Sequence, residues 1–322
     1  MDEFALIRRY FQPLQQPRQG TAEESVSVGI GDDCAVLNVP EGRQLVVSID
    51  TLVEGTHFLA DTPPEQLAWR LLGACVSDLA AMGATPSWLT LALTLPHADE
   101  AWVSAFSAAL SEATQLYRIR LVGGDTTRGP LTLTAQVHGF VKTDTALLRS
   151  NAQIGDLICV TGTLGDSRAG LETLLTKSSS NTVVEYLRQR FYRPQPRIST
   201  GQLISAYASA CIDISDGLLG DIQHIMDQSE VGAQINPEAL PLSAEIQHFT
   251  DDKTAREWAL SGGEDFELCF TVPPEQWLSL QAHLQNHDVQ VTPVGAICEA
   301  KGLQLFSQGE WCAVAANGYK HF

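Results

Sequence analysis

Acidic residues beside glycine or serine recur along this chain, and they are the side chains best suited to chemistry. They stand in the segments GIGDD at 29–33, SID at 48–50, SD at 77–78, GGD at 123–125 and DISD at 213–216. Hard cations such as Mg²⁺ prefer oxygen ligands of this kind. Two like charges about 4 Å apart repel by roughly 4 kcal/mol at an effective dielectric near 20, so clustered carboxylates need cations or protons. The pattern predicts a magnesium site that holds a polyphosphate.

Each segment taken alone also has a structural explanation, because aspartate is common in turns and at helix N-caps. Their repetition in one chain favours the metal site. No phosphate-binding GxxxxGK[ST] loop is present, and Cys34 replaces the third glycine of the GxGxxG pattern that begins at Gly29. Kinase HRD and DFG segments and a GxSxG nucleophile elbow are also missing from the sequence. A nucleotide would therefore bind without these motifs.

Strands and helices must bring these segments to the rim of a sheet, where loops carry function. Alternating and helical spacing in the first half predicts strands near 45–49, 88–95 and 131–140 and helices near 64–82 and 100–117. The clean alternation after Leu131 is typical of a half-buried antiparallel strand. The GGD segment follows a short strand at 119–122, so we expect it beyond the strand end. The first half is predicted to be a sheet layered against helices.

A polar, turn-rich stretch from Lys142 to Asp156 indicates a domain boundary. We therefore divide the chain into domains at residues 1–145 and 146–322. The second half predicts strands near 157–161, 211–215, 266–272 and 291–297, helices near 167–175, 183–190, 198–209 and 217–228, and an exposed loop at 177–182. The resulting fold class is α/β (α+β), in two domains.

Composition limits the class of protein. The 322 residues are 44% hydrophobic, which excludes a mainly disordered chain, and the net charge of −18 disfavours a nucleic-acid surface. Seven cysteines without a CxxC pair support neither a disulfide framework nor a zinc ribbon, so we interpret them as small buried apolar residues in a reducing cytoplasm. No signal peptide is recognisable at the start, and no apolar run is long enough to span a membrane.

In their order along the chain, these segments resemble the motif series of the bacterial thiamine-monophosphate kinase family. The matching segments are GIGDDCAV (29–36), SIDTLVEGTHF (48–58), SDLAAMGA (77–84), GGDTTRGP (123–130), DISDGL (213–218), SGGEDFELCF (261–270) and GYKHF (318–322). Each segment is short, but the ordered set is specific. The wider superfamily includes aminoimidazole ribonucleotide synthetase and selenophosphate synthetase, which also use ATP without a P-loop.

The resemblance implies a fold like that of aminoimidazole ribonucleotide synthetase. Its N-terminal domain, with a mixed or antiparallel sheet, would bind metal and ATP and pair with a second subunit into a barrel. Its C-terminal α/β domain would complete the ATP and substrate sites. The implied activity is ATP-dependent phosphorylation of thiamine monophosphate to thiamine diphosphate by a cytoplasmic homodimer, with several Mg²⁺ ions as cofactors and with no nucleic-acid or membrane partner.

The resemblance also implies roles for individual residues. Metal contacts would come from Asp33, Ser48, Ile49 (through its main-chain oxygen), Asp50, Asp78, Asp125, Asp213 and Asp216, and those nearest the transferring phosphate would be the catalytic Asp33, Asp78 and Asp213. ATP contacts would come from Gly124, Asp125, Arg149 and Ser215. Thiamine monophosphate would contact His57, Glu264 and Tyr319. Ala316 stands where some relatives carry an aromatic residue, so Tyr319 is the expected stacking ring, although core packing would equally explain it.

Two other functions fit parts of this pattern. Another superfamily enzyme could use the same ATP residues with a different acceptor, and only His57, Glu264 and the C-terminal segment argue against it. A silent ATP-binding or thiamine-phosphate-binding protein would be expected to have lost metal carboxylates, whereas every matched aspartate is present.

Overall fold

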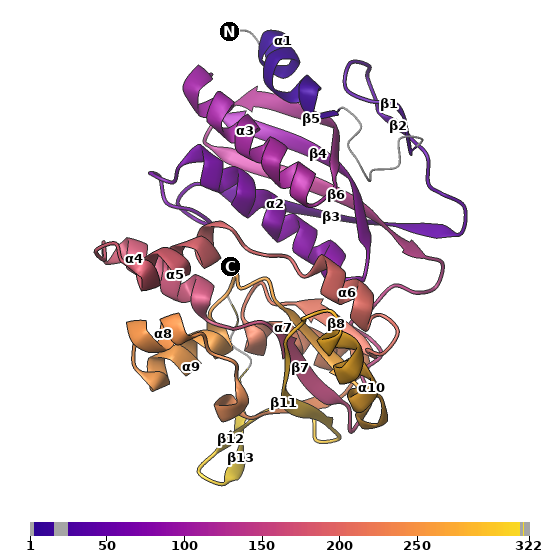
Figure 1. Ribbon diagram of the computed structural model, residues 1–322, viewed down its shortest axis with the longest axis vertical. Coiled ribbons are helices and arrows are strands. Elements are labelled where there is room, and N and C mark those ends of the chain that lie inside the picture. Colours follow the sequence, from indigo (N-terminus) through magenta and orange to yellow (C-terminus); the bar gives the residue numbers. More distant parts are fainter. Residues whose placement is uncertain (1–2, 16–24, 316–317, 319–322) are drawn as a thin grey trace. The chain divides into compact units, whose positions relative to one another are not determined.

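The computed structural model describes residues 3–15, 25–315 and Gly318 (Figure 1). The chain divides into two compact units. The N-terminal unit comprises Met1–Leu79 and Ala84–Thr145, and the C-terminal unit comprises Ala80–Gly83 and Ala146–Phe322. No helix in the described part of the chain has the length and apolar character needed to cross a membrane.

The N-terminal unit is built on a four-stranded sheet with the order β3-β6-β4-β5. These strands are β3 (Arg43–Val53), β4 (Thr85–Leu95), β5 (Arg120–Arg128) and β6 (Thr132–Lys142). β6 pairs antiparallel with both β3 and β4, whereas β5 runs parallel to β4. The alternating pattern after Leu131 therefore correctly predicted an antiparallel strand.

Helices α2 (Pro64–Ala81) and α3 (Glu100–Leu116) cover one face of this sheet (Figure 1). In β4, Leu89, Leu91 and Leu93 are buried while Thr90 and Ala92 between them are half-buried, as a strand with one face on the core requires. The smaller elements of the unit are α1 (Glu3–Leu6), the helical turns η1 (Ile7–Phe11) and η2 (Gln12–Gln15), and the paired strands β1 (Val26–Val28) and β2 (Val36–Leu37).

The prediction that a short strand ends at Val122 is wrong. β5 continues through the GGD segment to Arg128, and it pairs with β4 along this length after a bulge at Leu89 and Thr90. A Cβ atom on Gly124 would overlap the carbonyl oxygen of Leu91. Glycine here permits a close approach of two strands. A glycine within a strand often marks such an approach and does not necessarily mark the end of the strand.

The C-terminal unit is built on a seven-stranded sheet with the order β13-β12-β9-β11-β7-β10-β8. The strands are β7 (Leu157–Thr161), β8 (Ala210–Asp213), β9 (Gly232–Ile235), β10 (Leu268–Val272), β11 (Val291–Cys298), β12 (Gly302–Ser307) and β13 (Glu310–Val314). The helices are α4 (Asp166–Leu175), α5 (Thr182–Tyr192), α6 (Ile198–Ile204), α7 (Leu218–Ser229), α8 (Ala244–Phe249), α9 (Asp252–Ser261) and α10 (Pro274–Gln285), with the turn η4 (Pro237–Ala239). Every pair is antiparallel except β9 with β12.

Both faces of this sheet are covered at its centre. Ile158 and Val160 of β7 pack in a core with α7, whereas Cys159 between them packs in a second core with residues of α6 and α10. Continuous apolar runs such as LICVT follow from burial on both faces. The interpretation of the cysteines as buried apolar residues holds for Cys159 but is wrong for Cys34 and Cys312, which are exposed.

Candidate active site

Ser48, Asp50 and Asp78 come together between β3 and α2. Residues 48 and 50 lie two apart on a strand and therefore face the same side of the sheet. The Ser48 hydroxyl donates a hydrogen bond to the Asp78 carboxylate. Burial, and secondarily the charge of Asp78, raise the pKa of Asp50 to about 6. Ile49 points to the opposite face and is 58% exposed.

This donor set suits Mg²⁺. Its side-chain groups are all oxygen, and burial and the charge of Asp78 raise the pKa of Asp50, so a bound cation would stabilise its ionised form. The set is incomplete by itself, because no group of three or more His, Cys, Asp or Glu side chains able to hold a metal gathers among the described residues. The Ser48 hydroxyl and the Ile49 main-chain carbonyl can add oxygen ligands to the two carboxylates of Asp50 and Asp78.

A second set of the predicted residues lines one cavity of the N-terminal unit. Asp33, Gly124 and Asp125 surround a space of about 650 Å³, together with apolar side chains that include Phe11 and Leu93. Asp33 is exposed, on the loop that follows Gly31. The structure therefore places the glycine-rich loop beside the GGD segment of β5, with both carboxylates at a single cavity.

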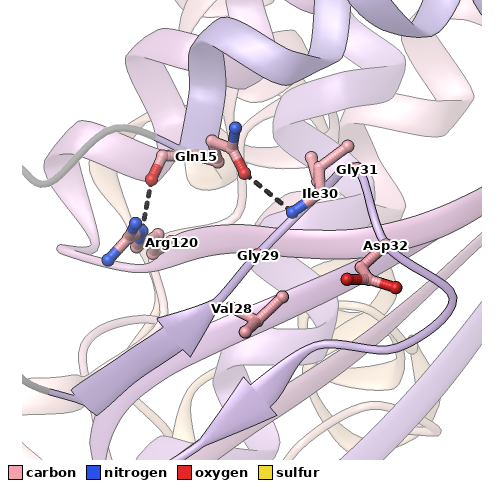
Figure 2. A pocket seen from close by; sticks show the side chains of 7 residues that line it. All are labelled: Gln15, Val28, Gly29, Ile30, Gly31, Asp32 and Arg120. Carbon is pink, nitrogen blue, oxygen red and sulfur yellow. Dashed lines mark hydrogen bonds between the residues drawn. The ribbon is translucent and has the colours of Figure 1, made fainter.

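Gln15 fixes the glycine-rich loop from the N-terminal segment, as Figure 2 shows at a neighbouring cavity of about 510 Å³. Its side-chain oxygen accepts a hydrogen bond from the Ile30 amide at 2.7 Å, and its main-chain oxygen accepts one from Arg120 Nε. A Cβ atom on Gly29 would lie 2.6 Å from the Gln15 side-chain oxygen. Sequence reasoning missed Gln15, because nothing in the polar QPLQQ run distinguishes it.

His57 sits in a tight turn after β3. Its Nδ1 atom accepts a hydrogen bond from the Val53 amide at 3.0 Å, and its carbonyl oxygen accepts from the buried Arg70 side chain at 3.1 and 3.3 Å. A neutral imidazole whose Nδ1 is an acceptor carries its hydrogen on Nε2. This hydrogen bond therefore assigns His57 as a donor through Nε2, a property that the sequence alone does not reveal.

In the C-terminal unit, the segment from Asp213 to Gly217 joins β8 to α7. Asp213 is the last residue of β8 and is buried. The Ser215 carbonyl accepts a hydrogen bond from the Glu264 amide at 2.7 Å, and Glu264 adopts a left-handed conformation with φ of 70°. The structure thus brings Asp213, Ser215, Asp216 and Glu264 together.

Asp221 supports this segment from α7. One of its carboxylate oxygens accepts hydrogen bonds from the amides of Ser215 and Asp216, each at 3.0 Å. Burial, and then the charge of Asp213, raise the pKa of Asp221 to about 8. Sequence reasoning missed Asp221, although an acidic residue in the first turn of a predicted helix was a usable signal.

The Arg149 side chain is exposed, and the main chain beside it is hydrogen-bonded to β8. The Arg149 carbonyl oxygen accepts a hydrogen bond from the Ser229 hydroxyl, and that of Leu148 accepts one from the Cys211 amide, each at 2.9 Å. Tyr319 lies outside the described residues. The preceding Gly318 packs against the first turn of α7, where a Cβ atom on Gly220 would lie 2.8 Å from its Cα.

The end of the SGGEDFEL segment is structural. The buried Glu267 accepts hydrogen bonds from Arg190 at 2.9 Å and from Thr161 at 2.6 Å, and it also pairs with Arg197. The buried Asp265 accepts from the amides of Gly165 and Ser167 at 2.6 and 3.1 Å. This network anchors the segment that carries Glu264.

Known proteins match this chain over most of its length. Residues 31–141 match the N-terminal domain, and residues 153–308 the C-terminal domain, of AIR synthase related protein. The chain is 48% identical over 323 residues to the thiamine-monophosphate kinase of Salmonella typhimurium, covering 99% of this chain and 98% of that protein.

Two solved structures are similar over nearly the whole chain. The thiamine-monophosphate kinase from Stenotrophomonas maltophilia K279a has a TM-score of 0.87 and 39% identity, over 97% of this chain and 98% of that one. A structure described as AaThiL complexed with AMPPCP and TMP has a TM-score of 0.80 and 34% identity, over 99% and 97%. These matches confirm the expected fold class, and they show that the chain belongs to the thiamine-monophosphate kinase family.

Proposed function

We propose that this chain transfers the γ-phosphoryl group of ATP to thiamine monophosphate, forming thiamine diphosphate and ADP. One observation carries the proposal. A relative that is 34% identical over 99% of this chain is described as complexed with AMPPCP and TMP, which we read as an ATP analogue and the thiamine monophosphate of the family name. The residues that the motif resemblance assigns to metal, ATP and acceptor gather in small groups within each unit, which supports the proposal.

To the proposed domain at residues 1–145 we assign metal binding and part of the ATP site. Asp50 and Asp125 would hold metal on the ATP side, with Ser48 and the Ile49 main-chain oxygen as further ligands. Asp33 and Asp78 would hold metal near the transferring phosphate. When bound, Mg²⁺ neutralises charge that accumulates on phosphate oxygens during transfer. The oxygen donors around Asp50 support this choice of metal.

To the proposed domain at residues 146–322 we assign the completion of the ATP and acceptor sites. Asp213 and Asp216 would hold metal, while Ser215 and Arg149 would contact ATP phosphates, for which the planar guanidinium of arginine is suited. Glu264 would contact the cationic thiamine moiety. His57, from the N-terminal unit, would donate from Nε2 to the acceptor, which agrees with the hydrogen bond at its Nδ1. Tyr319 remains the proposed stacking ring.

Product identification tests this function. We expect phosphorus NMR to show a new diphosphate resonance and ADP when the protein is incubated with ATP, Mg²⁺ and thiamine monophosphate. EDTA should remove the activity and excess Mg²⁺ should restore it. Parallel incubations with formylglycinamidine ribonucleotide or selenide as acceptor should give no product. Turnover of one of these, or binding of ATP and thiamine monophosphate without any turnover, would contradict the proposed function.

We further propose a homodimer formed through the sheet of the N-terminal unit. β3 is an edge strand, and its outward side chains Leu45, Val47 and Ile49 are 42%, 50% and 58% exposed. An exposed apolar edge strand is a site of pairing with another chain. A second copy that covers this strand would bury the apolar row and continue the sheet.

The dimer makes a measurable prediction. Light scattering at micromolar concentration should report about twice the chain mass of 34.9 kDa. Replacing Val47 with Lys should shift the protein toward monomer, because its side chain points away from the core of its own unit. Replacing Leu278 of α10, which is also exposed, with Lys is the control and should leave the dimer intact. A fully active monomer would contradict the proposal.

The proposed donor supports a cytoplasmic location, because ATP is made and used there. This assignment depends on the proposed function rather than on any targeting segment.

A further inference from the structure

We propose that Asp221 is a positioning residue for the nucleotide and metal site. It would act by fixing the main chain at Ser215 and Asp216, without contacting the metal or ATP itself. This inference rests on the proposed function, since it takes these two residues as ligands of the Mg²⁺–ATP complex.

The geometry of Asp221 is unlike that of an ordinary helix cap. An N-cap side chain precedes its helix and accepts from amides of the first turn. Asp221 instead lies inside the first turn of α7, which begins at Leu218, and reaches back to two amides that precede the helix. A single oxygen that binds two consecutive amides fixes the orientation of the peptide plane between Ser215 and Asp216.

The other side of the same segment is also held. The Ser215 carbonyl accepts from the Glu264 amide, and a Cβ atom on Gly263 would lie 2.6 Å from that carbonyl oxygen. Gly217 has φ of 99°, and a Cβ atom there would lie 2.7 Å from the Ser261 carbonyl carbon. The segment from Ser215 to Gly217 therefore contacts backbone on one side and the Asp221 carboxyl group on the other. Of these contacts, the one from Asp221 comes from a side chain and can be removed by a single substitution.

The burial of Asp221 also points to a positioning role. Asp221 is only 2% exposed and lies close to Asp213 and Asp216, so a third carboxylate is buried beside two others. A polar group buried this deeply costs free energy unless it is hydrogen-bonded, and the hydrogen bonds of Asp221 go to the backbone of Ser215 and Asp216. An apolar residue here would leave the two backbone amides without this acceptor, whereas an oxygen at this position both satisfies and aligns them.

Three variants separate these roles. Asp221→Asn keeps an oxygen acceptor, Asp221→Leu removes it at similar volume, and Asp221→Ala removes it with little steric demand. Asp227→Ala is the matched control, because Asp227 lies on the same helix and is exposed. Hydrogen exchange of the amides of residues 213–217 is measured on the metal-free protein, and binding of Mg²⁺–AMPPCP is measured by calorimetry.

In Asp221→Leu and Asp221→Ala, the amide hydrogens of residues 213–217 should exchange about tenfold faster than in the parent protein. Both variants should bind Mg²⁺–AMPPCP about 10–100-fold more weakly, as expected when a residue that orients metal ligands is lost. Asp221→Asn and Asp227→Ala should stay within about twofold of the parent protein in both measurements. Should Asp221→Leu not fold, the comparison of Asp221→Ala with Asp221→Asn remains.

Two results would overturn the inference. Unchanged exchange and nucleotide binding in a folded Asp221→Ala variant would show that the contact positions nothing. An Asp221→Asn variant as weak as Asp221→Ala would make the charge, and not the acceptor oxygen, the required feature. Neither measurement needs turnover, so a failure of the proposed activity would be recognised separately, as absence of product with the parent protein.

Discussion

Asp50→Asn should reduce turnover by about 10²–10³-fold and, without Mg²⁺, make the protein more stable than the parent at neutral pH. The loss of turnover follows from removing a charged oxygen from the proposed metal site. The gain in stability follows from the pKa of Asp50, which burial and the charge of Asp78 raise to about 6. At pH 7 the folded parent must hold an ionised carboxylate that the unfolded chain leaves in water.

The sign of the effect depends on pH. Below about pH 4 the carboxyl is protonated in both the folded and the unfolded chain, so it carries no penalty. Between about pH 4 and the folded value near 6 the folded state binds more protons, so stability falls as pH rises. Above that range the full penalty applies, on the order of 1–3 kcal/mol, and asparagine does not incur it.

Urea unfolding in EDTA checks this expectation. The variant should be more stable than the parent at pH 7.5 and not at pH 4, and saturating Mg²⁺ should reverse the order at pH 7.5, because a cation bound to the native parent stabilises it. Asp33→Asn is the control. Its carboxylate is exposed, so turnover should fall without a gain in stability. Near-normal turnover of Asp50→Asn would remove Asp50 from the site, and a less stable variant in EDTA at pH 7.5 would refute the electrostatic explanation.

Thiamine monophosphate should be phosphorylated and free thiamine should not. The phosphate oxygen of the monophosphate is already anionic at neutral pH, since its second pKa is near 6, so it needs orientation and no general base. The alcohol of thiamine must lose a proton during attack. The proposed carboxylates are assigned to metal, and His57 is the remaining candidate base. Its Nδ1 accepts from the Val53 amide, so Nε2 carries a hydrogen and cannot take another.

Phosphorus NMR with each acceptor decides this prediction. A diphosphate resonance should appear with the monophosphate, and no new ester resonance should appear with thiamine. His57→Asn can keep an acceptor near Nδ1 but lacks the donor at Nε2. It should raise KM for the monophosphate about tenfold and change kcat little, as loss of one hydrogen bond to a charged group does. Efficient conversion of thiamine, abolished in His57→Asn, would show that His57 acts as a base after all.

Hydrophobic periodicity predicted the helices and strands that bury one face or both faces in a core. The strands around Leu91 and Leu133 and the helix α2 lie near their predicted positions, because alternation and helical spacing report burial directly. The end of β5 was missed, since Gly123 and Gly124 have the composition of a loop while their main chain pairs with β4. Short strands such as β9 and β13 give no comparable signal.

Some residues of the candidate site could be predicted from the sequence, and others could not. Aspartates could be found from their types and their neighbours, because glycine and serine beside a carboxylate form a recognisable pattern. Gln15 and Arg70 could not, because each acts through hydrogen bonds to backbone atoms, and for Asp221 the sequence offers only its place in the first turn of a predicted helix. Any residue type can offer such backbone atoms, so their partners leave no trace in the sequence.

The attachment of the glycine-rich loop to Gln15 makes the N-terminal helical segment difficult to dispense with. Gln15 supports, through its side chain and its carbonyl oxygen, both the Ile30 amide and Arg120 at the start of β5. Trimming the protein to its sheet and long helices would remove that support while leaving every proposed ligand in place. The first turns of this chain thus act as a brace for a loop that lies 15 residues further along the sequence.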